Sequence, residues 1–125
     1  MENKQPTFGN GKICYLEIPA RDPRVSMLFY KEVFGWRIRE REDGSLAFDD
    51  GVGEVSGTWV TSRKPLSDPG IIISIMVDDA RATVDSIIAH GGKIERPLGK
   101  DAPEITALFS DPAGNVLGIY QHPVE

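Results

Sequence analysis

The stretch ICYLEIPARDPRVSMLFYKEVFGW, residues 13–36, decides the fold, because a strand, a helix start signal and a helix follow one another directly. Residues 13–18 are mostly apolar and predict a β-strand, which Pro19 ends. Asp22 followed by Pro23 is typical of a helix N-cap with proline at the first helical position. Apolar residues then recur at helical spacing until Gly35, a C-terminal stop. We therefore expect a strand over 13–18 and a helix over 23–34.

Three short strands and then a second copy of the same pattern are expected after this helix. The predicted strands are 36–42, 45–48 and 55–61, with a tight turn at Asp43-Gly44. The proline-rich segment SRKPLSDPG, residues 62–70, predicts a linker. A strand over 71–77 follows it, and then a helix that Asp78 or Asp79 caps and Gly91-Gly92 ends. The last predicted strands are 93–95, 106–109 and 116–121.

The two halves align residue by residue at positions of special geometry. Placing Tyr15 on Ile72 also places Asp22 on Asp79. Further along, the alignment pairs Phe48 with Phe109, Asp50 with Asp111, Gly53 with Gly114, Gly57 with Gly118 and Trp59 with Tyr120. Caps, turns and aromatic residues rarely coincide in order by chance, so the sequence predicts an internal duplication.

The composition is that of an ordinary globular chain with one domain. Of 125 residues, 40% are hydrophobic, and no apolar run approaches the roughly 20 residues of a membrane span. A net charge of −5 opposes nucleic-acid binding, which depends largely on cations. Residues 1–10 are expected to be flexible and contain no secretory signal, so we expect a cytoplasmic protein. The single cysteine, Cys14, is expected to be a buried, inert thiol.

Three segments of the chain carry a resemblance to a known superfamily. ICYLEIPARDP, FYKEVFGW and FSDPAGNVLGIYQ resemble the opening strand, the end of the first helix and the final hairpin of the vicinal oxygen chelate superfamily. That superfamily includes glyoxalase I, bleomycin-resistance proteins and extradiol dioxygenases. The resemblance covers residues 11–121 and implies an α+β fold, with a single glyoxalase-like domain over 11–125. Two tandem βαβββ modules, about 11–62 and 70–121, would form a cup-shaped mixed sheet with the helices on its outer face, and the chain would be a homodimer.

Metal-dependent relatives hold their ion with His, Gln or Glu side chains on the first and last strands of each module. The alignment of the halves places Tyr15, Gly57, Ile72 and Gly118 at these positions. Glycine and isoleucine have no donor atom, whereas divalent ions need three or more oxygen or nitrogen ligands. The resemblance therefore implies a cup without a metal or other cofactor.

Strand parity predicts which side chains face the cup instead. Leu16 and Ile18 are expected on the helix side of the first strand, which leaves Tyr15 and Glu17 on the cup side. The same reasoning assigns further lining residues to the other strands: Trp59, Ile72, Ser74, Met76 and Tyr120. This mixture of aromatic and apolar side chains with few polar groups is typical of a small-molecule pocket, although such residues also fill ordinary cores.

Charged residues on the second strand offer a partner for Glu17. Arg37, Arg39 and Arg41 share one face if the intervening residues pack on the helix, and they could then hold an anionic ligand at the rim of the cup. A solvated strand balanced by Glu40 and Glu42 is the alternative. Glu17 itself is either a general base, a cation-binding group or half of a structural ion pair.

Three functions remain open from the sequence. The first is a protein that binds a small hydrophobic or aromatic compound in the cup, as bleomycin-resistance proteins do, without a metal. The second is a metal-independent isomerase or lyase of the same fold, with Glu17 as general base and Tyr15 as proton donor. The third is a structural or interaction protein whose cup is filled by its own side chains.

Overall fold

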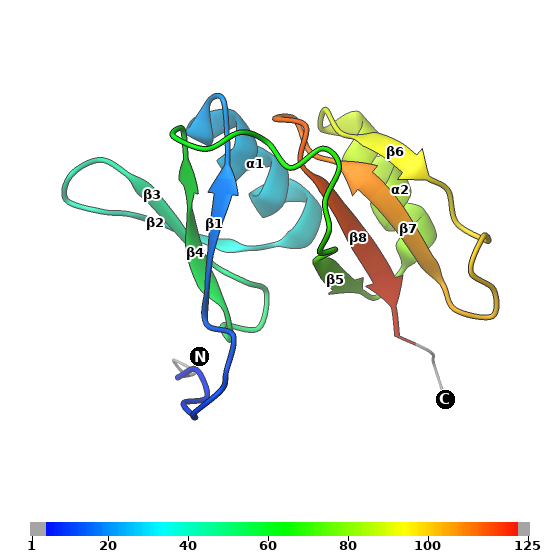
Figure 1. Ribbon diagram of the computed structural model, residues 1–125, viewed down its shortest axis with the longest axis horizontal. Coiled ribbons are helices and arrows are strands. Elements are labelled where there is room, and N and C mark those ends of the chain that lie inside the picture. Colours follow the sequence, from blue (N-terminus) through cyan, green and yellow to red (C-terminus); the bar gives the residue numbers. More distant parts are fainter. Residues whose placement is uncertain (1–4, 123–125) are drawn as a thin grey trace.

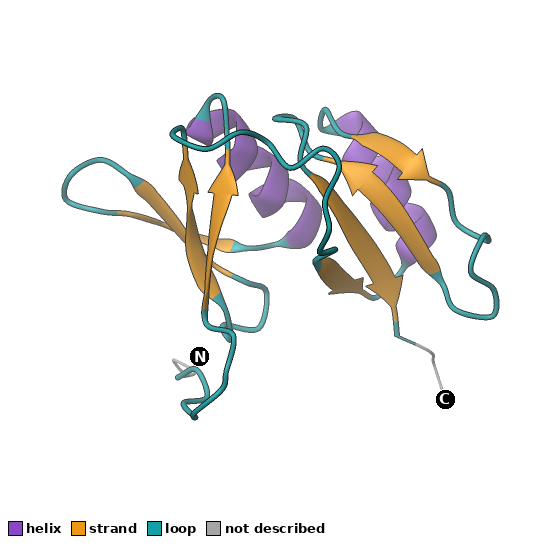
Figure 2. Ribbon diagram, viewed as in Figure 1, coloured by secondary structure: helices purple, strands orange, loops and turns teal. Residues whose placement is uncertain are grey.

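The computed structural model describes residues 5–122 and contains the predicted elements in the predicted order (Figures 1 and 2). The first module comprises β1 (Tyr15–Pro19), α1 (Pro23–Phe34), β2 (Arg37–Glu40), β3 (Leu46–Asp49) and β4 (Ser56–Val60). The second comprises β5 (Ser74–Val77), α2 (Ala80–Ala89), β6 (Lys93–Arg96), β7 (Thr106–Ser110) and β8 (Val116–Gln121). The α+β class and the tandem βαβββ arrangement are confirmed.

Both helices begin where the sequence placed their caps. The Asp22 carboxylate accepts a hydrogen bond from the backbone N–H of Arg24, and α1 ends at Gly35 with a left-handed backbone, φ 72°. At α2 the capping residue is Asp79, whose side chain accepts from the N–H of Ala82. In each module the cap therefore sets the angle at which the chain turns from the first strand into the helix.

The strands form two separate four-stranded mixed sheets rather than one continuous sheet. The strand order is β1-β4-β3-β2 in the first sheet and β5-β8-β7-β6 in the second, with β1 and β5 paired in parallel to β4 and β8. The linker after β4 crosses between the sheets, and no ladder joins β1 to β5 among the described residues (Figure 1). The cup-shaped sheet expected from the sequence is thus divided at the module boundary.

Helix α1 joins the two modules through its aromatic face. Phe29 and Phe34 of α1 pack against Phe109 of β7, with ring centroids 6.0 and 5.6 Å apart. Tyr30 donates a hydrogen bond of 2.7 Å to the buried carboxylate of Asp111. The modules are further tied by Asn115, whose side-chain amide donates to the carbonyl of Pro19 at 2.7 Å. Together these contacts make a core shared by both modules.

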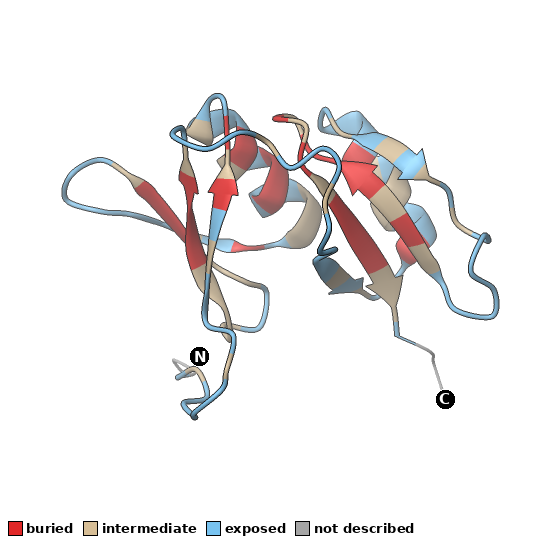
Figure 3. Ribbon diagram, in the orientation of Figure 1, coloured by how far each residue is buried: buried red, intermediate tan, exposed pale blue. Residues whose placement is uncertain are grey.

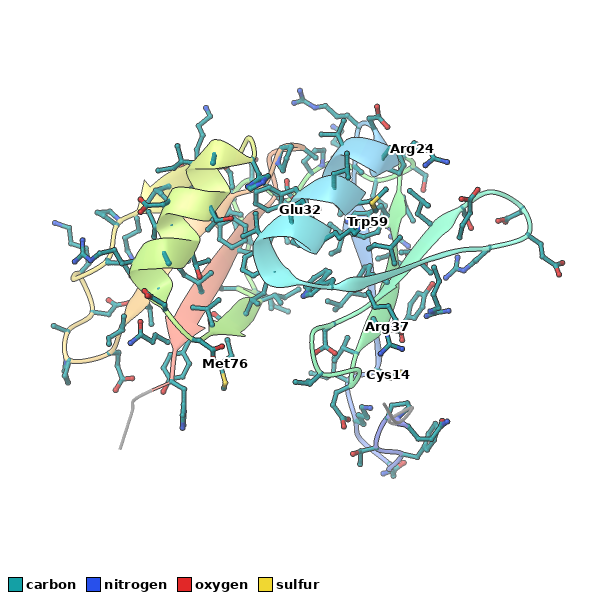
Figure 4. The ribbon with its side chains drawn as sticks, turned by 180° about the vertical axis from the view of Figure 1, so that it is seen from behind. Cys14, Arg24, Glu32, Arg37, Trp59 and Met76 are labelled. Atoms are coloured by element: carbon teal, nitrogen blue, oxygen red, sulfur yellow. The ribbon has the colours of Figure 1, made fainter. Side chains whose placement is uncertain are left out.

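The helices cover only one side of the sheets. In Figure 1 they lie behind the strands, and Figure 4 shows the same molecule from the helix side. The buried residues lie between helices and sheets, whereas the start of β1 and much of β5 are exposed (Figure 3). The side of each sheet that faces away from its helix is called its open face below, and these two faces correspond to the predicted cup.

The internal repeat holds through the hairpin turns but shifts by one residue after them. Asp50 closes its turn by donating its N–H to Val55, five residues on, whereas Asp111 donates to Asn115, four residues on. Phe48 therefore stands opposite Gly57, while Phe109 stands opposite Leu117. The predicted pairs Gly57–Gly118 and Trp59–Tyr120 are wrong for this reason. The structural counterparts of Gly118 and Tyr120 are Thr58 and Val60.

The first four residues of the segment predicted to be flexible lie outside the described residues. Within the described part, Thr7 donates its backbone N–H and its hydroxyl to the carboxylate of Glu54, at 3.1 and 3.2 Å. Lys12 donates to the same carboxylate at 3.2 Å. The chain before β1 is thus connected to the β3–β4 turn.

Candidate functional site

The open face of the first sheet is polar and carries most of the charged side chains that the sequence singled out. Ile38 pairs with Phe48, and both pack in the core, so the residues on either side of Ile38 point the other way. The arginines of β2 therefore lie on the open face, as predicted. The face consists of Tyr15, Glu17, Arg37, Arg39, Arg41, Ala47, Asp49, Ser56 and Thr58.

Trp59 does not line this face, contrary to the prediction. It pairs with Ile18 in the ladder, and its ring packs 4.8 Å from Phe48 and 6.0 Å from Tyr30, between the sheet and α1 (Figure 4). The parity prediction for β4 failed because it depended on the glycine alignment, which the longer turn shifts by one residue. The indole nitrogen of Trp59 is buried without a hydrogen-bond partner within residues 5–122.

Tyr15 and Arg41 meet above the open face although they lie on opposite edge strands. Arg41 Nη2 donates to Tyr15 Oη at 2.6 Å. Two strands separate β1 from β2, and at about 4.8 Å per strand the edges of a flat sheet would be about 14 Å apart. The two long side chains together span this distance, and Ala47 and Thr58, on the two strands between them, are buried.

Glu17 is paired with an arginine that the sequence analysis did not consider. Arg63, in the linker after β4, donates to Glu17 Oε1 through Nη2 at 2.7 Å and through Nε at 3.2 Å. The expectation that the arginines of β2 provide this partner is wrong. Both bonds use the same oxygen, so Oε2 has no hydrogen-bond partner in the described part of the chain.

Arg39 and Asp49 form a second ion pair on this face. Arg39 donates through Nε and Nη2 to the two carboxylate oxygens of Asp49 at 3.1 and 2.9 Å. The pKa of Asp49 is lowered, mainly by these hydrogen bonds and further by the Ser56 hydroxyl, which donates at 2.7 Å, and by the charges of Arg39 and Arg37. Arg39 is thus bound to Asp49. Arg37, in contrast, makes no ion pair or side-chain hydrogen bond within residues 5–122.

The open face of the second sheet carries apolar side chains on β5 and β8 and charged side chains only on its edge strand β6. Ile75 and Val77 pack toward the core, so Ser74 and Met76 point to the open side, where Ser74 lies opposite Gly118 and Met76 opposite Tyr120. Met76 on β5 is 65% exposed, and Ile72, two residues before β5, is 42% exposed beside Gly118. The face comprises Ile72, Ser74, Met76, Lys93, Arg96, Thr106, Leu108, Ser110, Val116, Gly118 and Tyr120. The predicted second-module residues thus share one face.

The donor atoms at the superfamily's metal positions do not fit a divalent ion. With the register of the structure, these positions are Tyr15, Thr58, Ile72 and Gly118. The Thr58 hydroxyl already donates to the carbonyl of Leu46 at 2.6 Å, and Tyr15 accepts from Arg41. Within residues 5–122 no three His, Cys, Asp or Glu side chains gather in a group that could hold a metal.

Cys14, His90 and two surface cavities complete the description of candidate features. Cys14 is exposed rather than buried, because α1 does not extend beneath the residues that precede β1. His90 caps α2, where its ring nitrogen Nδ1 lies 2.8 Å from the carbonyl of Ser86. Two surface cavities of about 390 and 530 Å³ lie at the ends of the strands, and Trp59 is the one predicted ligand residue among their lining residues.

The sequence analysis did not identify Arg63 or Asp49 as site residues, and it did not predict the contact of Arg41 with Tyr15. Arg63 lies in a linker without periodicity, so no spacing rule connects it to Glu17. Asp49 shares the parity of Ala47 on β3, and the pairing of β3 with β2 would have placed it beside the arginines. The available signal was therefore the hairpin register, which the turn at Asp43-Gly44 sets.

Comparison with protein families settles the fold family. The model of the Glyoxalase/Bleomycin resistance protein/Dioxygenase superfamily matches residues 12–119. The chain belongs to this superfamily. A protein of Vibrio parahaemolyticus named "probable lactoylglutathione lyase" is 30% identical over 129 residues, which cover 92% of this chain and 94% of that protein.

Two solved structures of the superfamily fold are similar in shape. A glyoxalase/bleomycin resistance protein/dioxygenase family enzyme from Burkholderia phytofirmans has a TM-score of 0.70 at 22% identity, covering 86% of this chain and 95% of that one. TnmS3, an antibiotic-binding protein from a Streptomyces species, has a TM-score of 0.68 at 22% identity, covering 94% and 100%. At this identity the similarity shows the fold alone. Within residues 5–122 no helix is long and apolar enough to cross a membrane.

Proposed function

We propose that the protein binds a small, partly aromatic or hydrophobic compound between the open faces of its sheets, without a metal. The observation that carries the proposal is the exposure of Met76, Ile72 and Tyr15, which are 65, 42 and 45% exposed on faces that no helix covers. Exposed apolar side chains on sheet faces that nothing covers are typical of a binding site. TnmS3, whose fold is similar, is described as an antibiotic-binding protein, which supports the same class of ligand.

The proposed site is completed by a second copy of the chain. The two sheets are separate, and α1 occupies the space between them, so the open faces do not close on each other within one chain. A homodimer in which the first sheet of one copy faces the second sheet of the other would cover Ile72 and Met76, which are 42 and 65% exposed. Each dimer would then contain two equivalent sites.

Binding is tested with a fluorescent apolar probe and with the protein as purified. Native mass spectrometry of the purified protein should detect a bound compound, and 1-anilinonaphthalene-8-sulfonate should bind with saturation. Met76→Asp places a charge on the apolar face and should weaken probe binding at least about tenfold. Val25→Asp, at an exposed position of α1, is the matched control and should leave it unchanged. A protein that binds no compound and no probe would instead support the structural role.

The free oxygen of Glu17 favours a second candidate, a metal-independent isomerase or lyase. Glu17 lies two residues from Tyr15 on the same strand face, so a potential base and a potential proton donor stand about 7 Å apart along the backbone. The relationship to a "probable lactoylglutathione lyase" supports a search for such activity. If turnover of a carbonyl substrate is found, Glu17→Gln should abolish it while leaving probe affinity nearly intact. An unchanged rate in Glu17→Gln would eliminate this candidate.

A further inference from the structure

The two open faces differ in charge. On the first, Arg37, Arg39, Arg41 and Arg63 are accompanied by two carboxylates, those of Glu17 and Asp49, so the formal charge of this face is +2. On the second, strands β5, β7 and β8 contribute no charged side chain, whereas the edge strand β6 places Lys93 and Arg96 opposite Ser110 and Leu108, and Arg96 is paired with Asp101. The excess of cations is local, because the whole chain carries a net charge of −5.

The positive charge on the first face is not spread evenly over its arginines. Arg39 is held by Asp49 and Arg63 by Glu17, with N–O distances of 2.9 and 2.7 Å. Arg37 and Arg41 form no ion pair among the described residues. Arg41 donates to a neutral acceptor, the Tyr15 hydroxyl, and a second nitrogen of its guanidinium lies 3.5 Å from the Ser45 hydroxyl. Two of the four guanidinium groups therefore lack an anionic partner.

Acidic residues near these arginines do not supply that partner. Glu40 lies on the opposite side of β2, where it contacts Arg24 of α1 at 3.9 Å. The pKa of Asp43 is lowered chiefly by hydrogen bonds from Ser45 and only to a smaller extent by the charge of Arg41, with which it forms no ion pair. Asp49 feels the charge of Arg37 but directs both of its oxygens to Arg39.

We propose that the ligand is an organic anion with an apolar body, whose anionic group is held by Arg37 and Arg41 and whose apolar part lies on the second open face. This inference rests on the proposed binding function. Guanidinium groups bind carboxylate and related anions through two parallel hydrogen bonds, and they do so more strongly where apolar surface excludes water. Tyr15, whose hydroxyl already contacts Arg41, lies where it can donate to the same anionic group.

The experiment compares three probes that share a ring but differ in charge: 1-naphthoate, 1-naphthamide and 1-naphthylmethylammonium. Binding is measured by isothermal titration calorimetry on the full-length protein. The anion should bind at least about tenfold more tightly than the amide, since one charge-assisted contact is worth about 1.5 kcal/mol or more. The cation should bind more weakly than the amide. Added salt should weaken binding of the anion and leave the amide nearly unaffected.

Two variants test whether Arg37 and Arg41 cause the preference for the anion. Arg37→Gln and Arg41→Gln should each reduce the preference for 1-naphthoate over 1-naphthamide severalfold, because the anion loses a cationic partner and the neutral amide does not. Arg24→Gln is the matched control: it removes the same charge from an exposed arginine on the helix side and should not alter the preference. Circular dichroism of each variant shows whether it is folded, and the amide affinity shows whether the apolar part of the site is intact.

The outcomes separate this inference from the function on which it rests. Equal affinities for the three probes, all sensitive to Met76→Asp, would overturn the anionic preference and retain the binding function. A preference that persists in Arg37→Gln and Arg41→Gln would also overturn the inference, because the anion would then be held elsewhere. Failure of every probe to bind at millimolar concentration would contradict both.

Discussion

Tyr30 and Asp111, which are 81 residues apart in the chain, form a buried hydrogen bond of 2.7 Å that joins the two modules. Tyr30 is fully buried on α1, and Asp111 is 3% exposed in the turn between β7 and β8. The Asp111 carboxylate also accepts from three backbone N–H groups of its turn and from the Asn115 side chain. A buried charge is thereby compensated by neutral donors from both modules.

Removal of the Tyr30 hydroxyl should destabilise the protein without disrupting the turn. Tyr30→Phe is expected to lower the free energy of unfolding by about 1–3 kcal/mol, because a buried ionised acceptor loses one donor. Tyr120→Phe is the control, since the Tyr120 hydroxyl makes no hydrogen bond in the described structure, and it should change stability by less than about 0.5 kcal/mol. Chemical denaturation of both variants at neutral pH provides the measurement. Equal stabilities of Tyr30→Phe and Tyr120→Phe would contradict a stabilising role of the Tyr30 hydroxyl.

The same contact should make stability depend on alkaline pH. Burial raises the pKa of Tyr30 well above its usual value, and the charge and hydrogen bond of Asp111 raise it further. In the unfolded chain a tyrosine loses its proton near pH of about 10, whereas folded Tyr30 retains it. Stability is therefore full below that pH and declines as the pH rises above it. The free energy of unfolding, measured across this pH range, should decline less in Tyr30→Phe than in the unaltered protein. Identical declines in the two proteins would show that Tyr30 is not the cause of the pH dependence.

Gly57 should be the less replaceable of two glycines on the central strands. A methyl group at Gly57 would collide with the Leu16 carbonyl and the ring of Phe48, both fixed in the core. Gly57→Ala is therefore expected to cost about 2 kcal/mol or more. At Gly118 the nearest atom is the hydroxyl of Ser74, 2.8 Å away at the end of a side chain that can rotate, so Gly118→Ala should cost less than about 1 kcal/mol. Thermal unfolding of the pair checks this order.

A mixed dimer can show whether each site is shared between two chains. Heterodimers of an Arg37→Gln chain and a Met76→Asp chain, isolated with two affinity tags, would contain one site with both faces intact if the faces pair between chains. They should then bind 1-naphthoate at about half the capacity of the unaltered dimer, while each variant homodimer binds poorly. If the heterodimer bound 1-naphthoate as poorly as the variant homodimers, each site would be formed within one chain.

Ligand binding should not require a metal. The hydroxyls of Tyr15 and Thr58 are engaged within the protein, and Ile72 and Gly118 offer no donor, so chelation should leave probe affinity unchanged. Elemental analysis of the purified protein, before and after treatment with a chelator, is the check. Stoichiometric zinc, nickel, manganese or iron that is needed for binding would contradict this prediction.

Local sequence signals were sufficient to predict the helices and strands and to place many of the candidate site residues. Asp22 and Asp79 predicted both helix starts, and the parity of β2 placed Arg37 and Arg39 on the correct face. The prediction for Trp59 failed because one additional residue in the turn after Asp50 reverses every side chain of the strand that follows. A one-residue difference in a turn is invisible when glycines in two halves happen to align.

The order of strands and helices, their caps and the tandem repeat were determined by the sequence alone, because each depends on residues that are neighbours in the chain. The pairing of Glu17 with Arg63, the contact of Arg41 with Tyr15 and the division of the strands into two sheets were decided by the tertiary structure. These features depend on strand register and on where α1 packs, and both follow from packing between segments far apart in the chain.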